Sequence, residues 1–181
     1  MAKRLTKEEK IKAFLENKAE CIKKAQEFMT TFEERVITFT IEGKPENYVR
    51  ERAGRGNHFY NPKGTKMKEY KNNMLHQMSK EDYEWTRELI KDENAKYELS
   101  ISMLFFLPTP KADSVDTTIK KEMGLLVPMS RPDVDNFVKF ILDSLHDVVY
   151  DDDSKVTDVY GAKRYSMNPR TIIECKIRKY K

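Results

Sequence analysis

The sequence predicts one α/β (α+β) domain, a mixed β-sheet with helices packed on it. The chain has 181 residues, of which 39% are hydrophobic and 35% are charged, so it is long enough to bury a core and unlike a disordered chain. Residues 97–107 and 171–180 alternate apolar and polar side chains, which is the strand period. Residues 66–90 and the segment after Val134 space their apolar residues as helices do. Strands and helices mixed in this order favour helices covering a sheet.

The first 34 residues are predicted to be an amphipathic helical extension, and residues 35–181 are predicted to be the main domain. Thr6-Lys7-Glu8-Glu9 has the form of a capping box, and apolar residues recur at helical spacing as far as Thr30. We therefore expect one helix over residues 6–30. Its expected role is to cover a sheet edge or to enlarge a dimer.

The other elements follow from caps, alternation and turn residues. Ser79 is expected to divide the helical segment 66–90 into two pieces. Asn168-Pro169 predicts a turn that joins the last two strands as an antiparallel hairpin. The remaining predicted elements are a strand at 36–41, a short helix capped by Asp113 or Ser114 and ended by Gly124, and a strand at 155–166.

Several classes of protein are excluded by composition. The two cysteines, Cys21 and Cys175, have no CxxC or histidine partner, so neither a zinc site nor a disulfide framework is expected. No N-terminal apolar run resembles a signal peptide, and no window approaches the roughly 20 apolar residues of a membrane span. We expect a cytoplasmic protein.

A long loop with basic and aromatic residues follows the first strand. The net charge of +4 is too small to indicate a nucleic-acid partner, so the distribution of charge has to carry that argument. Residues 43–64 contain Arg50, Arg52 and Arg55 among tyrosine, phenylalanine and histidine. This mixture suits phosphate contacts together with stacking on unpaired bases. The alternative is a solvated loop with its aromatic side chains in the core.

Acidic residues concentrate at Arg131-Pro132-Asp133-Val134-Asp135-Asn136, with Lys139 following, and again at residues 151–153. If the chain stays extended through Asp135, then Asp133 and Asp135 point the same way. Two carboxylates about 4 Å apart repel by roughly 4 kcal/mol at an effective dielectric constant of about 20, so a cluster of three needs a compensating charge. Oxygen-only ligands select Mg²⁺ or Mn²⁺, which in a basic protein indicates phosphate chemistry. The alternatives are a solvated acidic turn or a structural cation site.

These residues together resemble the signature of the RusA-type Holliday-junction resolvases. The resemblance covers residues 131–163: the PDxDNxxK pattern, then Asp143-Ser144-Leu145, then an aspartate run that precedes Ser154, and finally Lys163. It implies a homodimer that cuts four-way DNA junctions by paired nicks, with Mg²⁺ as cofactor and Mn²⁺ as a substitute. The resemblance further implies a small enzyme of the bacterial cell, of a kind that prophages and phages often encode.

By position, the resemblance assigns catalysis and metal binding to Asp133, Asp135 and Asp153, with Asp152 as the runner-up for the third acid. Lys139 is the implied catalytic lysine. The implied supporting residues and DNA contacts are Arg131, Asn136, Lys163, Arg50, Arg52 and Arg55. The predicted function is thus a structure-selective endonuclease of recombination and repair. Two alternatives stay open, a non-catalytic branched-DNA-binding module with a structural cation site and a Mg²⁺-dependent hydrolase of small phosphate compounds.

Overall fold

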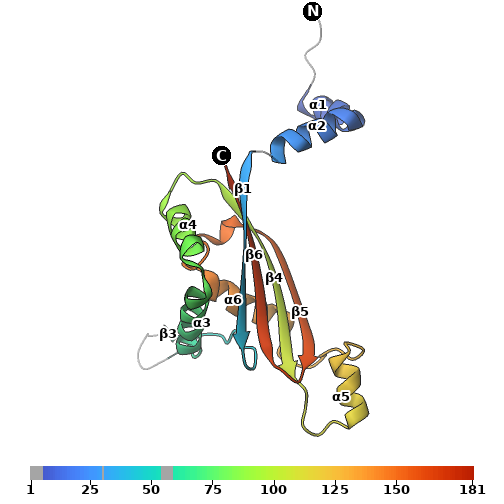
Figure 1. Cartoon of the computed structure of the whole chain (residues 1–181), viewed down its shortest axis with the longest axis vertical. Coiled ribbons are helices and arrows are strands. Elements are labelled where there is room, and N and C mark those ends of the chain that lie inside the picture. The colour runs from blue at the N-terminus through green and yellow to red at the C-terminus, as the bar shows by residue number, and fades with distance from the viewer. Residues whose placement is uncertain (1–5, 30, 54–58) are drawn as a thin grey trace, which may run out of the picture.

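The computed structural model describes residues 6–29, 31–53 and 59–181. Its elements alternate helices with long strands (Figure 1). In chain order they are α1 (Lys7–Glu16), α2 (Lys18–Met29), β1 (Phe32–Glu42), β2 (Arg52–Ala53), β3 (Phe59–Tyr60), α3 (Gly64–Gln77), α4 (Lys80–Lys91), β4 (Tyr97–Pro108), α5 (Val115–Glu122), α6 (Val134–Leu145), the 3₁₀ turn η1 (Asp153–Lys155), β5 (Val156–Ser166) and β6 (Arg170–Tyr180).

The four long strands form one mixed sheet in the order β1-β6-β4-β5. β6 runs antiparallel to both β1 and β4, whereas β5 is parallel to β4. The predicted class, an α+β domain with a mixed sheet and two C-terminal strands, is confirmed. The predicted hairpin is not, because β4 lies between β5 and β6, which run in opposite directions without pairing. The three residues between them reach across two strand spacings of about 4.8 Å each.

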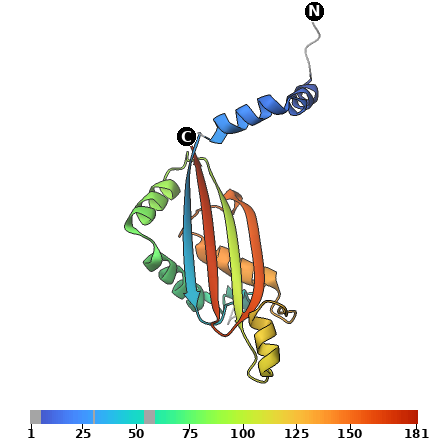
Figure 2. The ribbon, with the colours of Figure 1, turned by 45° about the vertical axis from the view of Figure 1, so that its right-hand side comes forward.

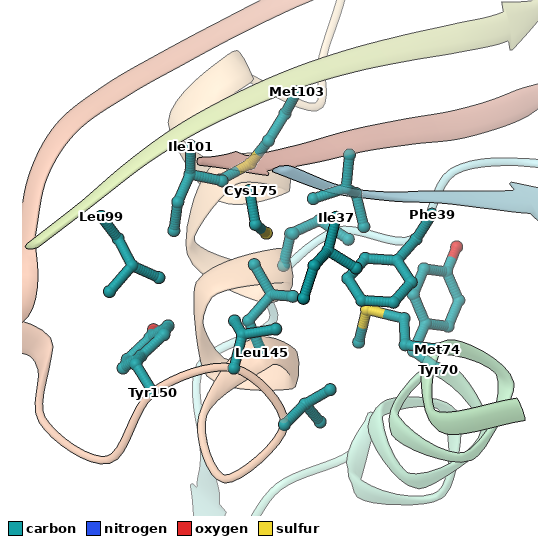
Figure 3. Close-up of a cluster of buried hydrophobic side chains, with 14 of the residues drawn as sticks. Ile37, Phe39, Tyr70, Met74, Leu99, Ile101, Met103, Leu145, Tyr150 and Cys175 are labelled. Atoms are coloured by element: carbon teal, nitrogen blue, oxygen red, sulfur yellow. The ribbon is translucent and has the colours of Figure 1, made fainter. Parts of the chain in front are cut away.

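One face of the sheet carries the hydrophobic core. Alternate residues of β1, β4 and β6 are buried there beneath α3, α4 and α6 (Figure 2). Figure 3 shows Ile101 and Met103 of β4 and Ile37 of β1 directed toward Leu145 of α6 and Met74 of α3. β4 is an inner strand of the sheet, and every second residue along it is buried. The core therefore fixes α6 against the sheet, which matters for the site described below.

Side-chain caps mark the N-termini of α1, α2, α4 and α5. Thr6 and Glu9 form the predicted capping box, and Ser79 and Ser114 cap α4 and α5 as expected. The single helix predicted over 6–30 is wrong, because Asn17 interrupts it. The Asn17 side chain accepts a hydrogen bond from the Glu20 amide at 3.3 Å and begins α2 as a second capped helix.

Within the described residues, no helix is both long enough and apolar enough to cross a membrane.

Candidate active site

The Asp133 carboxylate stands at the start of α6. Asp133 is the N-cap residue, with extended backbone angles, but its side chain makes no capping hydrogen bond and is exposed. Asp135 lies in the first helical turn, so the condition for strand alternation, an extended chain through Asp135, is not met. The chain becomes helical at Val134, one residue too early for that geometry. Both carboxylates instead share the positive end of the α6 dipole, which favours negative charge there.

Lys163 holds the loop that leads into Asp133. Its ammonium donates hydrogen bonds to the Ser130 carbonyl at 3.0 Å and to the Pro132 carbonyl at 2.9 Å. Lys163 comes from β5, on the sheet face that α6 covers, and its side chain is partly buried. The Arg131–Pro132 peptide bond within this loop is cis. In the structure the Lys163 ammonium therefore binds backbone carbonyls, whereas the sequence suggested a DNA contact.

Residues 44–50 cross the first turns of α6. The Tyr48 amide donates to the Asn136 carbonyl at 2.7 Å, and the Glu46 amide donates to the Tyr70 hydroxyl at 3.3 Å. Lys139 lies one turn after Asn136, and its Nζ atom is 4.0 Å from the centre of the Tyr48 ring. The ring face attracts the ammonium and so restrains its position. No feature of the sequence paired Tyr48 with Lys139.

A groove of about 380 Å³ lies between this segment and the start of α6. The groove is polar and basic at its rim, where Arg50 and Arg131 are both exposed. It brings together residues that are more than 80 positions apart in the chain. The lining consists of Asn47, Tyr48, Val49, Arg50, Arg131, Pro132, Asp133 and Asn136. Three predicted DNA contacts, Arg50, Arg131 and Asn136, thus surround one predicted catalytic acid.

The other two predicted basic contacts lie elsewhere in the loop. Arg52 is exposed on β2, where it is paired in register with Tyr60 of β3. Arg55 is outside the described residues. Arg52 does not line the groove.

The three aspartates of the acidic run have different partners. Asp151 accepts a hydrogen bond from the buried Tyr97 hydroxyl, and burial together with this carboxylate raises the pKa of Tyr97. Asp152 accepts from the Ser154 amide at 2.8 Å, and this bond lowers the pKa of Asp152. The charge of Asp153 instead acts on Tyr150 and Asp143. Burial and then the Asp153 charge raise the pKa of Tyr150.

Asp143, which belongs to α6, interacts electrostatically with Asp153 of η1. Burial is the main cause that raises the pKa of Asp143, the Asp153 charge adds to it, and the Lys139 charge opposes it. The sequence suggested only that Asp143 pairs with Lys139 four residues before it. The four-residue spacing of Asp135, Lys139 and Asp143 was the signal in the sequence that places Asp143 near the site. These three residues form one charged ridge along α6.

Within one chain, Asp153 does not join Asp133 and Asp135. Asp153 lies beside Asp143, and eight residues of helix separate Asp143 from Asp135, a rise of about 12 Å. The sheet gives the same result, because Lys163 touches the Asp133 loop, whereas Asp153 precedes the first residue of β5. Among the residues that the structure describes, no three acidic, histidine or cysteine side chains gather as a metal site.

The donor set at the start of α6 still suits a hard divalent cation. Mg²⁺ is commonly held by one or two carboxylates, with water and substrate phosphate as its other ligands. Asp133 and Asp135 are two exposed carboxylates beside a groove with a basic rim. They would hold such an ion where a phosphate bound by Arg50 or Arg131 comes close.

An α+β fold with carboxylates and arginines around one groove is compatible with phosphate chemistry, and the comparisons identify the family. The family model described as Endodeoxyribonuclease RusA matches residues 38–176, so the chain belongs to the RusA family. The family takes its name from an endodeoxyribonuclease, and nucleases of this family act on branched DNA and depend on divalent metal.

One curated relative shares part of the chain. It is the Bacillus subtilis (strain 168) protein named "Uncharacterized protein YqaN", which is 42% identical over 82 residues. The match covers 44% of this chain and 56% of the relative, so the chain spans little more than half the length of that relative.

Proposed function

We propose that this protein is a Mg²⁺-dependent, structure-selective endonuclease that resolves Holliday junctions by paired phosphodiester hydrolysis during recombination and repair. It acts as a homodimer in the bacterial cytoplasm, and Mn²⁺ substitutes for Mg²⁺. One observation carries the proposal: the groove places Arg50, Arg131 and Asn136 around Asp133. The nuclease domain is residues 35–181 and the N-terminal extension is residues 1–34, in accord with a family match that begins at residue 38.

The groove residues divide the work of binding and orientation. Arg50 and Arg131 bind phosphates of the cut strand, because exposed guanidinium groups form bidentate contacts with phosphate oxygens. Asn136, whose amide nitrogen lies 3.3 Å from an Asp135 carboxylate oxygen, orients that carboxylate. Asp133 and Asp135 hold the divalent ion, which activates water and stabilises charge on the phosphate when bound.

Lys139 acts one turn further along α6. Held at the Tyr48 ring, its ammonium stabilises the negative charge that develops on an oxygen of the cleaved phosphodiester. Asp153 remains the proposed third acid, in preference to Asp152, whose carboxylate accepts from the Ser154 amide. With Asp143, Asp153 offers a second pair of oxygen donors at the other end of the ridge. About 12 Å of helix between the pairs exceeds the roughly 4 Å spacing of two-metal sites, so within one chain the two pairs would hold cations separately.

A non-catalytic branched-DNA-binding module with a structural cation site is the second candidate. The separation of Asp153 from Asp133 favours it, because a three-carboxylate centre is not formed within the described part of one chain. Both candidates bind junctions through the same basic groove, so binding alone does not distinguish them.

A substrate series distinguishes the two functions. The purified protein is incubated with an immobile four-way junction, a fork and a linear duplex of shared sequence, with Mg²⁺, Mn²⁺ or EDTA. The proposal predicts symmetric nicks in the junction, dependent on metal and absent from the duplex. Salt-sensitive junction binding without cleavage in either metal would instead establish the binding module. Arg50→Ala and Arg131→Ala should each lower the salt slope of binding by about 1.

A further inference from the structure

The segment from α5 to the loop before Asp133 exposes an unusual amount of apolar surface. Six of its large hydrophobic side chains are between 48 and 90% exposed. We call them the α5 patch, and they are Val115, Ile119, Met123, Leu125, Val127 and Met129. The described residues contain eighteen exposed large hydrophobic side chains, and seven of them, these six and Leu126 at 42%, lie within residues 115–129.

The local structure explains why these side chains face outward. The other side of α5 packs on the end of β5, where Glu122 accepts hydrogen bonds from the Ser166 hydroxyl at 3.0 Å and the Met167 amide at 2.8 Å. Lys121, also on that side, lies 4.4 Å from the centre of the Tyr165 ring. Val115, Ile119 and Met123 are spaced by four residues and form the opposite stripe.

The chain then folds back along the end of α5. Gly124 has a φ of 74°, a conformation that glycine adopts readily, and the Leu125 amide donates to the Lys120 carbonyl at 2.9 Å. The loop residues Leu125, Val127 and Met129 continue the exposed apolar surface from the helix. Figures 1 and 2 show α5 projecting beyond the sheet at the ends of β4 and β5.

The area of the patch is at the upper end of what a monomer usually leaves open. A large apolar side chain buries on the order of 100 Å², so six that are mostly exposed present roughly 600 Å². The largest apolar patch of a monomeric protein is about 300–600 Å². A stable dimer buries about 800 Å² on each partner, which the patch and a polar rim together supply.

The charges around the patch favour a second copy over DNA. Residues 111–129 contain three basic and three acidic side chains, so the surface has no excess positive charge for phosphates. Lys120 pairs with Asp116 at 2.6 Å, and Lys121 pairs with Asp113 at 2.5 Å. An apolar centre with a balanced rim is complementary to itself, as a two-fold interface requires.

We propose that the α5 patch is the surface through which two copies of this chain form a two-fold dimer. The inference rests on the proposed function, for which it names the dimer interface. Met129 lies four residues before Asp133, so a two-fold axis at the patch sets the spacing between the two α6 N-termini. Two opposed strands of one junction then meet two equivalent sites.

The oligomeric state tests the interface without any nuclease reaction. The wild-type protein should sediment at twice the 21.4 kDa chain mass in micromolar solution. Met123→Glu and Leu125→Glu each place a charge at the centre of the patch and should weaken dimerisation by about 100-fold or more. Both positions are exposed, so the far-UV circular dichroism spectrum and unfolding midpoint should stay near those of wild type.

Two matched controls place the same charge on other exposed apolar sites. Ile22→Glu on α2 and Val36→Glu on β1 should remain dimeric, since these positions are 51 and 54% exposed outside the patch. A monomeric wild type overturns the interface, as does a dimer that survives both patch substitutions or dissociates only in a control. A dimer that persists while the patch variants lose junction binding would assign the patch to DNA and would also overturn the interface.

The outcomes separate the interface from the nuclease. A monomeric wild type that cuts junctions overturns only the interface, whereas a dimer that depends on the patch but cuts no DNA overturns only the nuclease. On a plasmid cruciform, the dimer should give linear product. Leu125→Glu should accumulate nicked circles.

Discussion

Replacing Lys163 with methionine should damage catalysis more than DNA binding. Methionine keeps the apolar stem of the side chain but removes the ammonium that donates to the Ser130 and Pro132 carbonyls at 3.0 and 2.9 Å. The loop that positions Asp133 then loses its connection to β5. A DNA-contacting lysine would show the opposite pattern, so this substitution tests the role that the structure gives Lys163.

The expected magnitudes follow from these two contacts. A hydrogen bond from a charged donor contributes about 1.5–3 kcal/mol, but water can replace the ammonium at the exposed Ser130 carbonyl. We therefore expect Lys163→Met to lower the free energy of unfolding by about 1–3 kcal/mol, or the unfolding midpoint by roughly 3–10 °C. A displacement of the Asp133 carboxylate by about 1 Å should lower single-turnover cleavage about 100-fold.

Three measurements make the comparison. Urea unfolding gives the stability, junction binding in EDTA gives the affinity, and single-turnover cleavage in Mg²⁺ gives the rate. Lys91→Met, at the exposed end of α4, is the matched control and should leave all three unchanged. A Lys163→Met protein that cuts at the wild-type rate would refute the positioning role. So would normal stability combined with weaker binding and a salt slope lower by about 1, which marks a phosphate contact.

Three further substitutions test neighbouring contacts. Tyr48→Leu should slow cleavage about 2- to 30-fold by removing the ring 4.0 Å from the Lys139 ammonium, whereas Tyr48→Phe should retain the rate of wild type. Gly161→Ala should lower the free energy of unfolding by about 1–3 kcal/mol, because its Cβ would lie 2.5 Å from Val138 Cγ2, and Val138→Ala should recover part of that loss. Asp143→Asn should raise the unfolding midpoint at pH 7, because burial raises the pKa of Asp143 and its ionised form therefore costs stability. The gain should disappear as the pH falls through this raised pKa toward the unfolded value of about 4; a constant gain at every pH would contradict the cause.

Local features of the fold were predictable from the sequence because local interactions produce them. Ser79 and Ser114 cap their helices through hydrogen bonds to amides three residues ahead. The break at Asn17 follows the same rule, since Asn17-Lys18-Ala19-Glu20 has the form of a capping box. Apolar residues recur at helical spacing through residues 6–30 without a gap, which concealed the capping signal at Asn17.

The strand order could not be predicted from local patterns. The turn at Asn168-Pro169 correctly indicated that the chain reverses between the last two strands. Turn residues do not determine which strand lies beside which, and β4 lies between β5 and β6 in the sheet.

The candidate site was predicted in part for the same reason. Asp133, Asp135 and Lys139 are local to one helix, and their proximity followed from spacing alone. Tyr48 and the Lys163 contacts are non-local, and no sequence period connects them to α6. Asp153 was expected near Asp133, but the parallel crossover places it at the other end of α6.

The Asp135 carboxylate provides the most direct test of the nuclease assignment. Wild type and Asp135→Asn are compared on one four-way junction in Mg²⁺, with Asp158→Asn, an exposed position of β5, as the control. Asp135→Asn should abolish cleavage and should bind the junction at least as tightly as wild type, because the substitution removes negative charge but leaves the basic groove intact. Metal-dependent cleavage retained by Asp135→Asn, with contaminating wild-type enzyme excluded, would contradict the proposed site.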